Sequence, residues 1–210
     1  MKKIAVALMC TILATGAAMA QKQFTFGPKV GVDYTNYWGK GTEHGGKLSY
    51  QAGLFMEYRV TNKFSLAPEV VFAAQGGKYE IKRMDVVYKE TDNVNYINVP
   101  VMMKFYVCPE LSIDFGPQVG FNVYSKNTAE AKVANEKGKI TTNMKDYTNT
   151  VDFGLGLGLT YNITEDVFVQ GRYTMGLTKV FDTKDNVLLE ALGFDNPKNG
   201  NAQIAIGYRF

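Results

Sequence analysis

Apolar and polar residues alternate along much of this chain with a period of two. Between Val151 and Tyr161, for example, aliphatic and aromatic residues occupy every odd position, while Asp, Gly and Thr occupy the even ones. Successive side chains of a β-strand point to opposite faces, so this pattern predicts strands with one apolar and one polar face. Eight segments share it: 24–37, 48–60, 64–75, 95–107, 111–124, 150–161, 167–178 and 201–210.

The connections between these segments alternate between short and long. Thr61 to Lys63 and Cys108 to Glu110 are tight turns, and Asn162 to Asp166 is nearly as short. The segments 76–94, 125–149 and 179–200 are much longer, whereas the first gap, 39–47, is intermediate. Short turns at one end and long loops at the other are typical of outer-membrane barrels. The sequence predicts an all-β fold: an eight-stranded antiparallel up-and-down transmembrane β-barrel with short periplasmic turns and longer extracellular loops.

The character of the two faces distinguishes a membrane barrel from a soluble, lipocalin-like binder. The apolar face ends near the short turns in a row of aromatic residues: Phe24, Phe26, Tyr58, Phe64, Phe105, Tyr161, Tyr208 and Phe210. Aromatic rings gather where a membrane barrel meets the lipid headgroups. The polar face is rich in Gly, Ser, Thr and Gln, whereas the outside of a soluble barrel carries many more Lys and Glu. The outer membrane and its lipid bilayer are therefore the expected environment.

Residues 1–20 have the layout of a cleaved export signal. Lys2 and Lys3 precede a short apolar stretch, and Ala18-Met19-Ala20 satisfies the small-x-small cleavage rule. We expect a mature chain of residues 21–210, forming one barrel domain and beginning at Gln21, as N-terminal sequencing would show. A lipoprotein beginning at Cys10 is the alternative.

Charge and cysteine content exclude several other classes of protein. Without Lys2 and Lys3, the 23 basic residues become 21 against 20 acidic ones, so the mature chain is close to neutral. No nucleic-acid partner is expected, because that requires a clustered basic face. Cys108 is the only cysteine of the mature chain, which rules out an internal disulfide.

The charged residues within the strands all lie on the polar face, five of each sign: Lys29, Asp33, Glu57, Arg59, Glu69, Lys104, Asp114, Asp152, Arg172 and Arg209. An eight-stranded barrel has an interior just wide enough for its own side chains. Buried charges there need partners, so we expect a structural network that plugs the lumen. Counting back from the turn at Cys108 places Lys104 opposite Asp114 as an ion pair. Glu57 and Glu69 lie on a diagonal, close enough to repel, and need a shared cation that Lys29, Arg172 or Arg209 could supply.

The last strand and the fourth strand carry a family resemblance. Ile204, Ile206, Tyr208 and the final Phe210 resemble the C-terminal signature of outer-membrane proteins. The segment 96–105, Tyr-Ile-Asn-Val-Pro-Val-Met-Met-Lys-Phe, is similar to a strand motif of the PorT-like barrels of Bacteroidetes, which share the architecture of OmpX and the OmpA barrel. The resemblance implies that Phe210 is a membrane-insertion signal that the outer-membrane insertion machinery recognises. One branch of the family is linked to protein secretion.

Other residues offer weaker functional readings. His44, the only histidine, has Ser49 and Glu43 nearby, but neighbours in sequence do not define a catalytic triad. In the last loop, Asp182, Asp185, Asn186 and Glu190 lack the spacing of a calcium loop. Glycines at every second position from Gly154 to Gly158 indicate a crowded lumen rather than a phosphate loop. The segment 125–149 reads as a mobile, surface-exposed loop.

The expected function is therefore non-enzymatic, with no catalytic residue, cofactor or metal, and with surface loops as the recognition elements. Three alternatives stay open: an accessory component of a secretion or surface-assembly system, a barrel lipid-modifying enzyme using His44, and a soluble lipocalin-like binder.

Overall fold

A computed structural model describes residues 23–38, 45–83, 86–133, 136–180 and 198–210. The proposed export signal, 1–20, lies outside these residues. The described chain is almost entirely β-structure, apart from a single 3-10 turn at Lys145–Tyr147. The strands are β1 (Phe24–Trp38), β2 (Lys47–Thr61), β3 (Phe64–Gln75), β4 (Lys78–Arg83), β5 (Val86–Cys108), β6 (Leu111–Val133), β7 (Glu136–Asn143), β8 (Val151–Asn162), β9 (Val167–Gly176) and β10 (Lys198–Tyr208).

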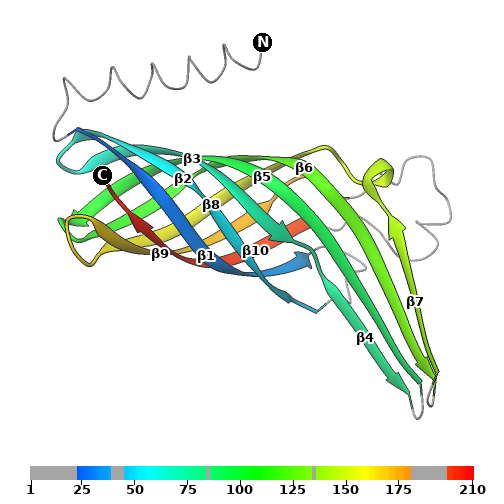
Figure 1. Cartoon of the computed structure of the whole chain (residues 1–210). Coiled ribbons are helices and arrows are strands. Elements are labelled where there is room, and N and C mark those ends of the chain that lie inside the picture. Colours follow the sequence, from blue (N-terminus) through cyan, green and yellow to red (C-terminus); the bar gives the residue numbers. More distant parts are fainter. Residues whose placement is uncertain (1–22, 39–44, 84–85, 134–135, 181–197) are drawn as a thin grey trace.

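Eight of these strands close into a ring of antiparallel neighbours (Figure 1). Their order is β5-β3-β2-β1-β10-β9-β8-β6, and pairing of β6 with β5 closes the circle. The first and last strands of the ring, β1 and β10, are neighbours from Lys29↔Gly207 to Trp38↔Lys198. All eight strands predicted from the alternation are present, and the predicted barrel fold is confirmed.

The stagger of the ring fixes its dimensions. Stepping from partner to partner around the ring from Tyr96 returns to β5 at Tyr106, ten residues further along. With eight strands, a rise of ~3.3 Å per residue and a strand spacing of ~4.8 Å, this stagger gives a tilt of roughly 40° and a backbone radius of about 8 Å. Side chains pointing inward from such a wall meet near the axis.

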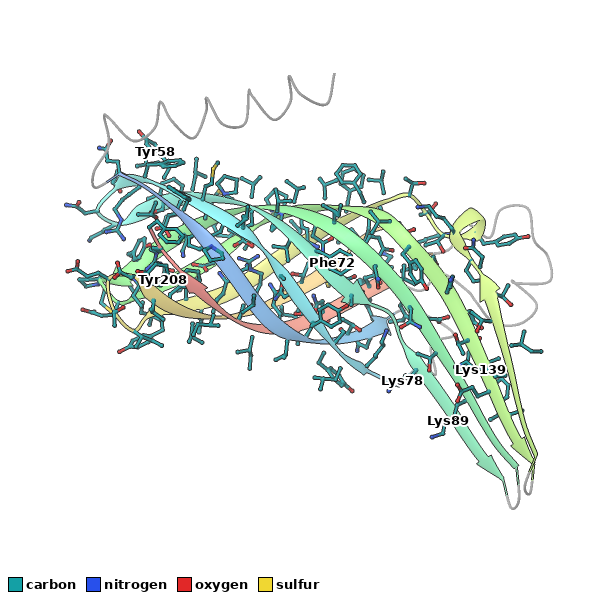
Figure 2. All side chains as sticks on the ribbon, viewed as in Figure 1. Tyr58, Phe72, Lys78, Lys89, Lys139 and Tyr208 are labelled. Carbon is teal, nitrogen blue, oxygen red and sulfur yellow. The ribbon has the colours of Figure 1, made fainter. Side chains whose placement is uncertain are left out.

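The outward face is apolar and carries two rows of aromatic residues. The row near the short turns is the predicted one, and its rings touch: Phe26 packs on Phe210 with centroids 5.7 Å apart, and Phe64 on Phe105 at 5.0 Å. A second row near the other end contains Tyr34, Tyr50, Phe72, Phe121 and Phe153, all exposed. Figure 2 shows Tyr58 and Tyr208 near one end of the barrel and Phe72 toward the other. The eight residue steps from Phe26 to Tyr34 span about 20 Å along the barrel axis, which suits the lipid-facing band of a membrane barrel.

The segments expected to be loops after β3 and β6 are folded, which corrects the prediction of a mobile loop at 125–149. Both β5 and β6 are 23 residues long and stay paired beyond the barrel as far as Val86↔Val133. β4 pairs with the outer part of β5, and β7 with the outer part of β6. The result is a four-stranded sheet, β4-β5-β6-β7, that projects from one end of the barrel (Figure 1). We call it the external sheet.

Candidate functional site

The lumen holds most of the charged side chains singled out in the sequence. Arg59 and Asp152 are half-buried, and the other eight are buried: Lys29, Asp33, Glu57, Glu69, Lys104, Asp114, Arg172 and Arg209. They come from seven strands of the ring and, for Arg209, from the residue directly after β10, so their contacts cross the interior as well as the strand pairs.

Glu69 of β3 is the centre of the first ion-pair group. Its carboxylate accepts two hydrogen bonds from the guanidinium of Arg172, at 3.0 and 2.7 Å, and one from Lys29 Nζ at 2.6 Å. Lys29 Nζ also donates to Gln170 Oε1 at 3.0 Å. Bidentate arginine–carboxylate pairs are among the strongest polar contacts in proteins. This group joins β1, β3 and β9 through the interior.

Glu57 of β2 is the centre of the second group. Its Oε2 lies 3.4 Å from Lys104 Nζ and 3.7 Å from the guanidinium of Arg209, and the Tyr106 hydroxyl donates to its Oε1. The guanidinium of Arg209 also stacks over the ring of Phe168, 4.6 Å from its centroid. Glu57 and Glu69 therefore draw on separate cations, whereas the sequence suggested a shared one.

The predicted ion pair between Lys104 and Asp114 does not form, although the predicted register is correct. The two residues are directly opposite each other on β5 and β6. Lys104 instead points to Glu57, and Asp114 accepts hydrogen bonds from Ser112 Oγ at 2.6 Å, Gln170 Nε2 at 3.1 Å and the Thr160 hydroxyl. Neutral donors satisfy Asp114, and the partner of Lys104 comes from β2, beyond its neighbour β3. In the sequence, the Ser, Thr and Gln residues of the polar face were the feature that indicated neutral hydrogen-bond donors for a buried carboxylate.

The alternate glycines of β8 lie where the lumen is crowded, as the sequence suggested. A Cβ atom on Gly156 would meet Met102 and Arg172 side chains at 3.3 and 3.4 Å. On Gly158 it would meet the backbone oxygen of Gly171 at 2.5 Å. A larger residue at either position would displace Arg172, through its side chain at Gly156 and through its backbone at Gly158.

The external sheet is the second candidate site, because its outward face differs from the lipid-facing wall below it. Along β5 this face changes from Val101 and Ile97 to Thr91 and Lys89. The register aligns Lys89 with Glu130 and Lys139, and the last two form an exposed ion pair at 3.0 Å. A row of threonines, Thr91, Thr128 and Thr141, lies beside this charged row. A polar face of this kind is suited to water rather than to hydrocarbon.

Comparison with known proteins agrees with this architecture. Residues 19–182 match the family model described as outer membrane protein beta-barrel domain. The chain belongs to this family of outer-membrane β-barrel proteins. No curated protein sequence matches it.

Several solved outer-membrane barrels are similar to this family member at low sequence identity. Ail, the attachment invasion locus protein of Yersinia pestis, is 15% identical, with 90% of this chain and 99% of that one covered and a TM-score of 0.47. Neisserial surface protein A is 13% identical, with coverage of 89% and 97% and a TM-score of 0.42. CarO of Acinetobacter baumannii is 12% identical, with coverage of 87% and 97% and a TM-score of 0.43. The family match and the closed ring establish an outer-membrane β-barrel.

Some sequence candidates of this barrel protein lie outside the described residues: Glu43, His44, Asp182, Asp185, Asn186 and Glu190. Of the suggested triad only Ser49 is described, half-buried on β2. Cys108 is a free, exposed thiol at the end of β5. Across the described ranges, no three His, Cys, Asp or Glu side chains gather to hold a metal ion. Within the same ranges, no helix is long and apolar enough to cross a membrane.

A barrel with this interior is expected to conduct no steady current. Glu57, Glu69 and their four cations are buried across the lumen, so a hydrated ion meets side chains rather than a water column. Planar-bilayer recording of the purified protein should show a flat baseline, whereas stable and well-resolved channel openings would contradict a plugged lumen. A sixteen-stranded porin, recorded in the same bilayers, is the positive control.

Proposed function

We propose that this protein is a non-enzymatic surface-recognition protein, in which the barrel is a plugged membrane anchor and the external sheet is the binding element. The observation that carries the proposal is the continuity of β5 and β6, which extend without a break from the lipid-facing wall into a sheet with a polar outward face. An ordered sheet presents its side chains at fixed spacings, which favours recognition over simple loop connection.

The charges of the external sheet indicate the chemistry of the partner. Lys78, Lys89 and Lys139 lie along the sheet (Figure 2), and the pairing places them on its outward face. Among the side chains of this face that the structure describes, one acidic residue, Glu130, accompanies these lysines, so positive charge is in excess among them. An anionic partner, such as a sulfated or phosphorylated polysaccharide, would complement that excess.

Two further parts of the proposal concern Phe210 and the sequence motif of β5. The terminal Phe210 packs against Phe26 and Tyr208, and we propose that it serves the insertion machinery before it takes this place in the aromatic row. The Tyr96–Phe105 motif supports placement with the PorT-like barrels of Bacteroidetes. A role as an accessory of secretion or surface assembly is the second candidate, and the external sheet would then bind another protein of that machinery.

Dextran sulfate binding to whole cells tests the proposal, with uncharged dextran as the reference ligand. Substitution of Lys78, Lys89 and Lys139 by alanine should weaken binding at least tenfold, because each lysine–phosphate or lysine–sulfate contact contributes on the order of 1 kcal/mol. Binding of the unchanged protein should fall steeply with salt. Lys63→Ala removes an exposed lysine from a short turn at the opposite end of the barrel, so it controls for effects of substitution on expression and should leave binding unchanged.

A variant without the external sheet separates the anchor from the binding element. Replacing 76–93 and 127–142 by Asn-Gly turns preserves the pairs Gln75↔Val94 and Lys126↔Asn143. The shortened protein should still show the heat-dependent shift in gel migration of a folded barrel, but it should lose dextran sulfate binding. Undiminished binding by this variant would contradict the proposal.

A further inference from the structure

The outer half of the lumen differs from the inner half in how its acidic side chains are satisfied. In the inner half, Glu57 and Glu69 each have two cations, and Asp114 has three neutral donors. Asp33, in the outer half of β1, is only 1% exposed, yet neither of its carboxylate oxygens accepts a hydrogen bond from any residue that the structure describes. Burial of an unpaired, charged carboxylate is strongly unfavourable.

Other oxygens without hydrogen-bond partners lie on β10, which is next to β1, and on β9, which is the strand after it. Asn201 of β10 is diagonal to Asp33, because Asp33 is paired with Gln203. Thr174 of β9 is directly opposite Asn201. Asn201 Oδ1 and Thr174 Oγ1 are both buried, and neither has a partner among the described residues. Three adjacent strands thus bring a carboxylate, an amide oxygen and a hydroxyl together.

The opposite wall of the lumen adds two more such groups. Tyr96 and Asn122 are directly opposite each other on β5 and β6, and both point inward. The Tyr96 hydroxyl and Asn122 Oδ1 are buried without a partner in the described part of the chain. The outer lumen therefore presents oxygen atoms from both walls, and most of them are acceptors.

The cations of the inner lumen are already engaged. Lys29 lies on the same strand and face as Asp33, but its ammonium group is bound to Glu69 and Gln170. Arg172, on β9, forms its two-pronged pair with Glu69. No described lysine or arginine forms a salt bridge with Asp33. An ionised Asp33 therefore has no counter-charge among the described residues, and a cation from outside the protein could supply one.

We propose that Asp33, Asn201 and Thr174 form a binding site for a single dehydrated monovalent cation, Na⁺ or K⁺, in the outer lumen. Hard cations favour oxygen ligands. One carboxylate with neutral oxygens matches a single positive charge, whereas a divalent ion would leave a net charge in a buried site. Asp33 is next to Tyr34 of the outer aromatic row, so the ion reaches the site from the external mouth. The ion-pair groups below block further passage.

Thermal unfolding in different chloride salts tests the site. At constant ionic strength, replacing N-methylglucamine by Na⁺ or K⁺ should raise the unfolding temperature of the full-length protein in detergent, because a ligand bound only by the folded state stabilises it. Asp33→Asn keeps the shape of the side chain and should abolish the difference between salts. Asp114→Asn, at a carboxylate already satisfied by neutral donors, is the matched control and should retain it.

Two further measurements make the outcome independent of the stability of a variant. The ²³Na resonance should broaden in the presence of the unchanged protein, and K⁺ should narrow it again by competition. Asn201→Asp supplies a second carboxylate and should shift the preference from Na⁺ toward Ca²⁺. The proposal would be overturned if the unfolding temperature did not depend on the cation and the protein did not broaden the ²³Na line. An Asp33→Asn variant that is more stable by the same amount in every salt would also overturn it, because the carboxyl would then be protonated.

Discussion

Replacement of Glu69 by alanine is expected to lower the free energy of unfolding by about 3–5 kcal/mol. The carboxylate lies between Lys29 and Arg172 inside the barrel, and its removal leaves two buried cations without a counter-charge. Urea-induced unfolding of the protein in lipid vesicles would measure the change, followed by the fluorescence of Trp38, the only tryptophan. Comparison of folded fractions on unheated gels gives an independent reading.

Two controls separate the effect of burial from that of charge. Glu130→Ala breaks the exposed pair with Lys139 on the external sheet and should cost less than about 1 kcal/mol. A triple variant with Glu69→Leu, Lys29→Met and Arg172→Met removes the whole group and should recover much of the loss, because apolar side chains can replace a buried ion-pair group. A Glu69→Ala variant as stable as the unchanged protein would show that water reaches this part of the lumen.

Leu157→Arg is expected to destabilise the barrel by about 2–4 kcal/mol, the cost of an arginine at the bilayer midplane. Leu157 is exposed on the outward face of β8, four residues from Phe153 of the outer aromatic row and four from Tyr161 of the inner row. Its side chain therefore lies halfway through the lipid-facing band. The same vesicle unfolding experiment would measure the loss.

The control for depth uses the same strand and the same face. Phe153→Arg places the charge at the outer aromatic row, where the cost of the charge falls to about 0–1 kcal/mol. A larger loss at position 153 than at position 157 would mean that the midplane lies elsewhere. Equal, small losses at both positions would contradict a lipid-facing wall on β8.

The barrel was predictable from the sequence because each ring strand has one apolar and one polar face. The tight turns at Asn62 and Pro109 fix the neighbours, so even the register Lys104↔Asp114 followed by counting. The identity of the ion pairs did not follow. Lys104 and Glu57 are on strands that are not neighbours in the ring, and their contact depends on the radius and stagger of the whole barrel.

The external sheet could not be predicted from alternation. Between Lys126 and Asn143 polar residues occur on both faces, since both faces of the sheet lie outside the lipid-facing band. A period-two signal requires that one face be buried. β4 and β7 are ordered because they pair with the parts of β5 and β6 that extend beyond the barrel. The length of these extensions can be seen only when the closed ring of strands is known.

The continuity of β5 and β6 also has a mechanical consequence. A pull on the tip of the external sheet, directed along its strands, draws β5 and β6 in the same direction and loads in shear the backbone hydrogen bonds that join them to β3 and β8. These bonds run across the strands, so they share the load together rather than opening one after another. The two ladders extend from Val94 to Phe105 on β5 and from Phe121 to Leu111 on β6. A force applied to the external sheet is thus distributed along the wall of the barrel through the whole thickness of the membrane.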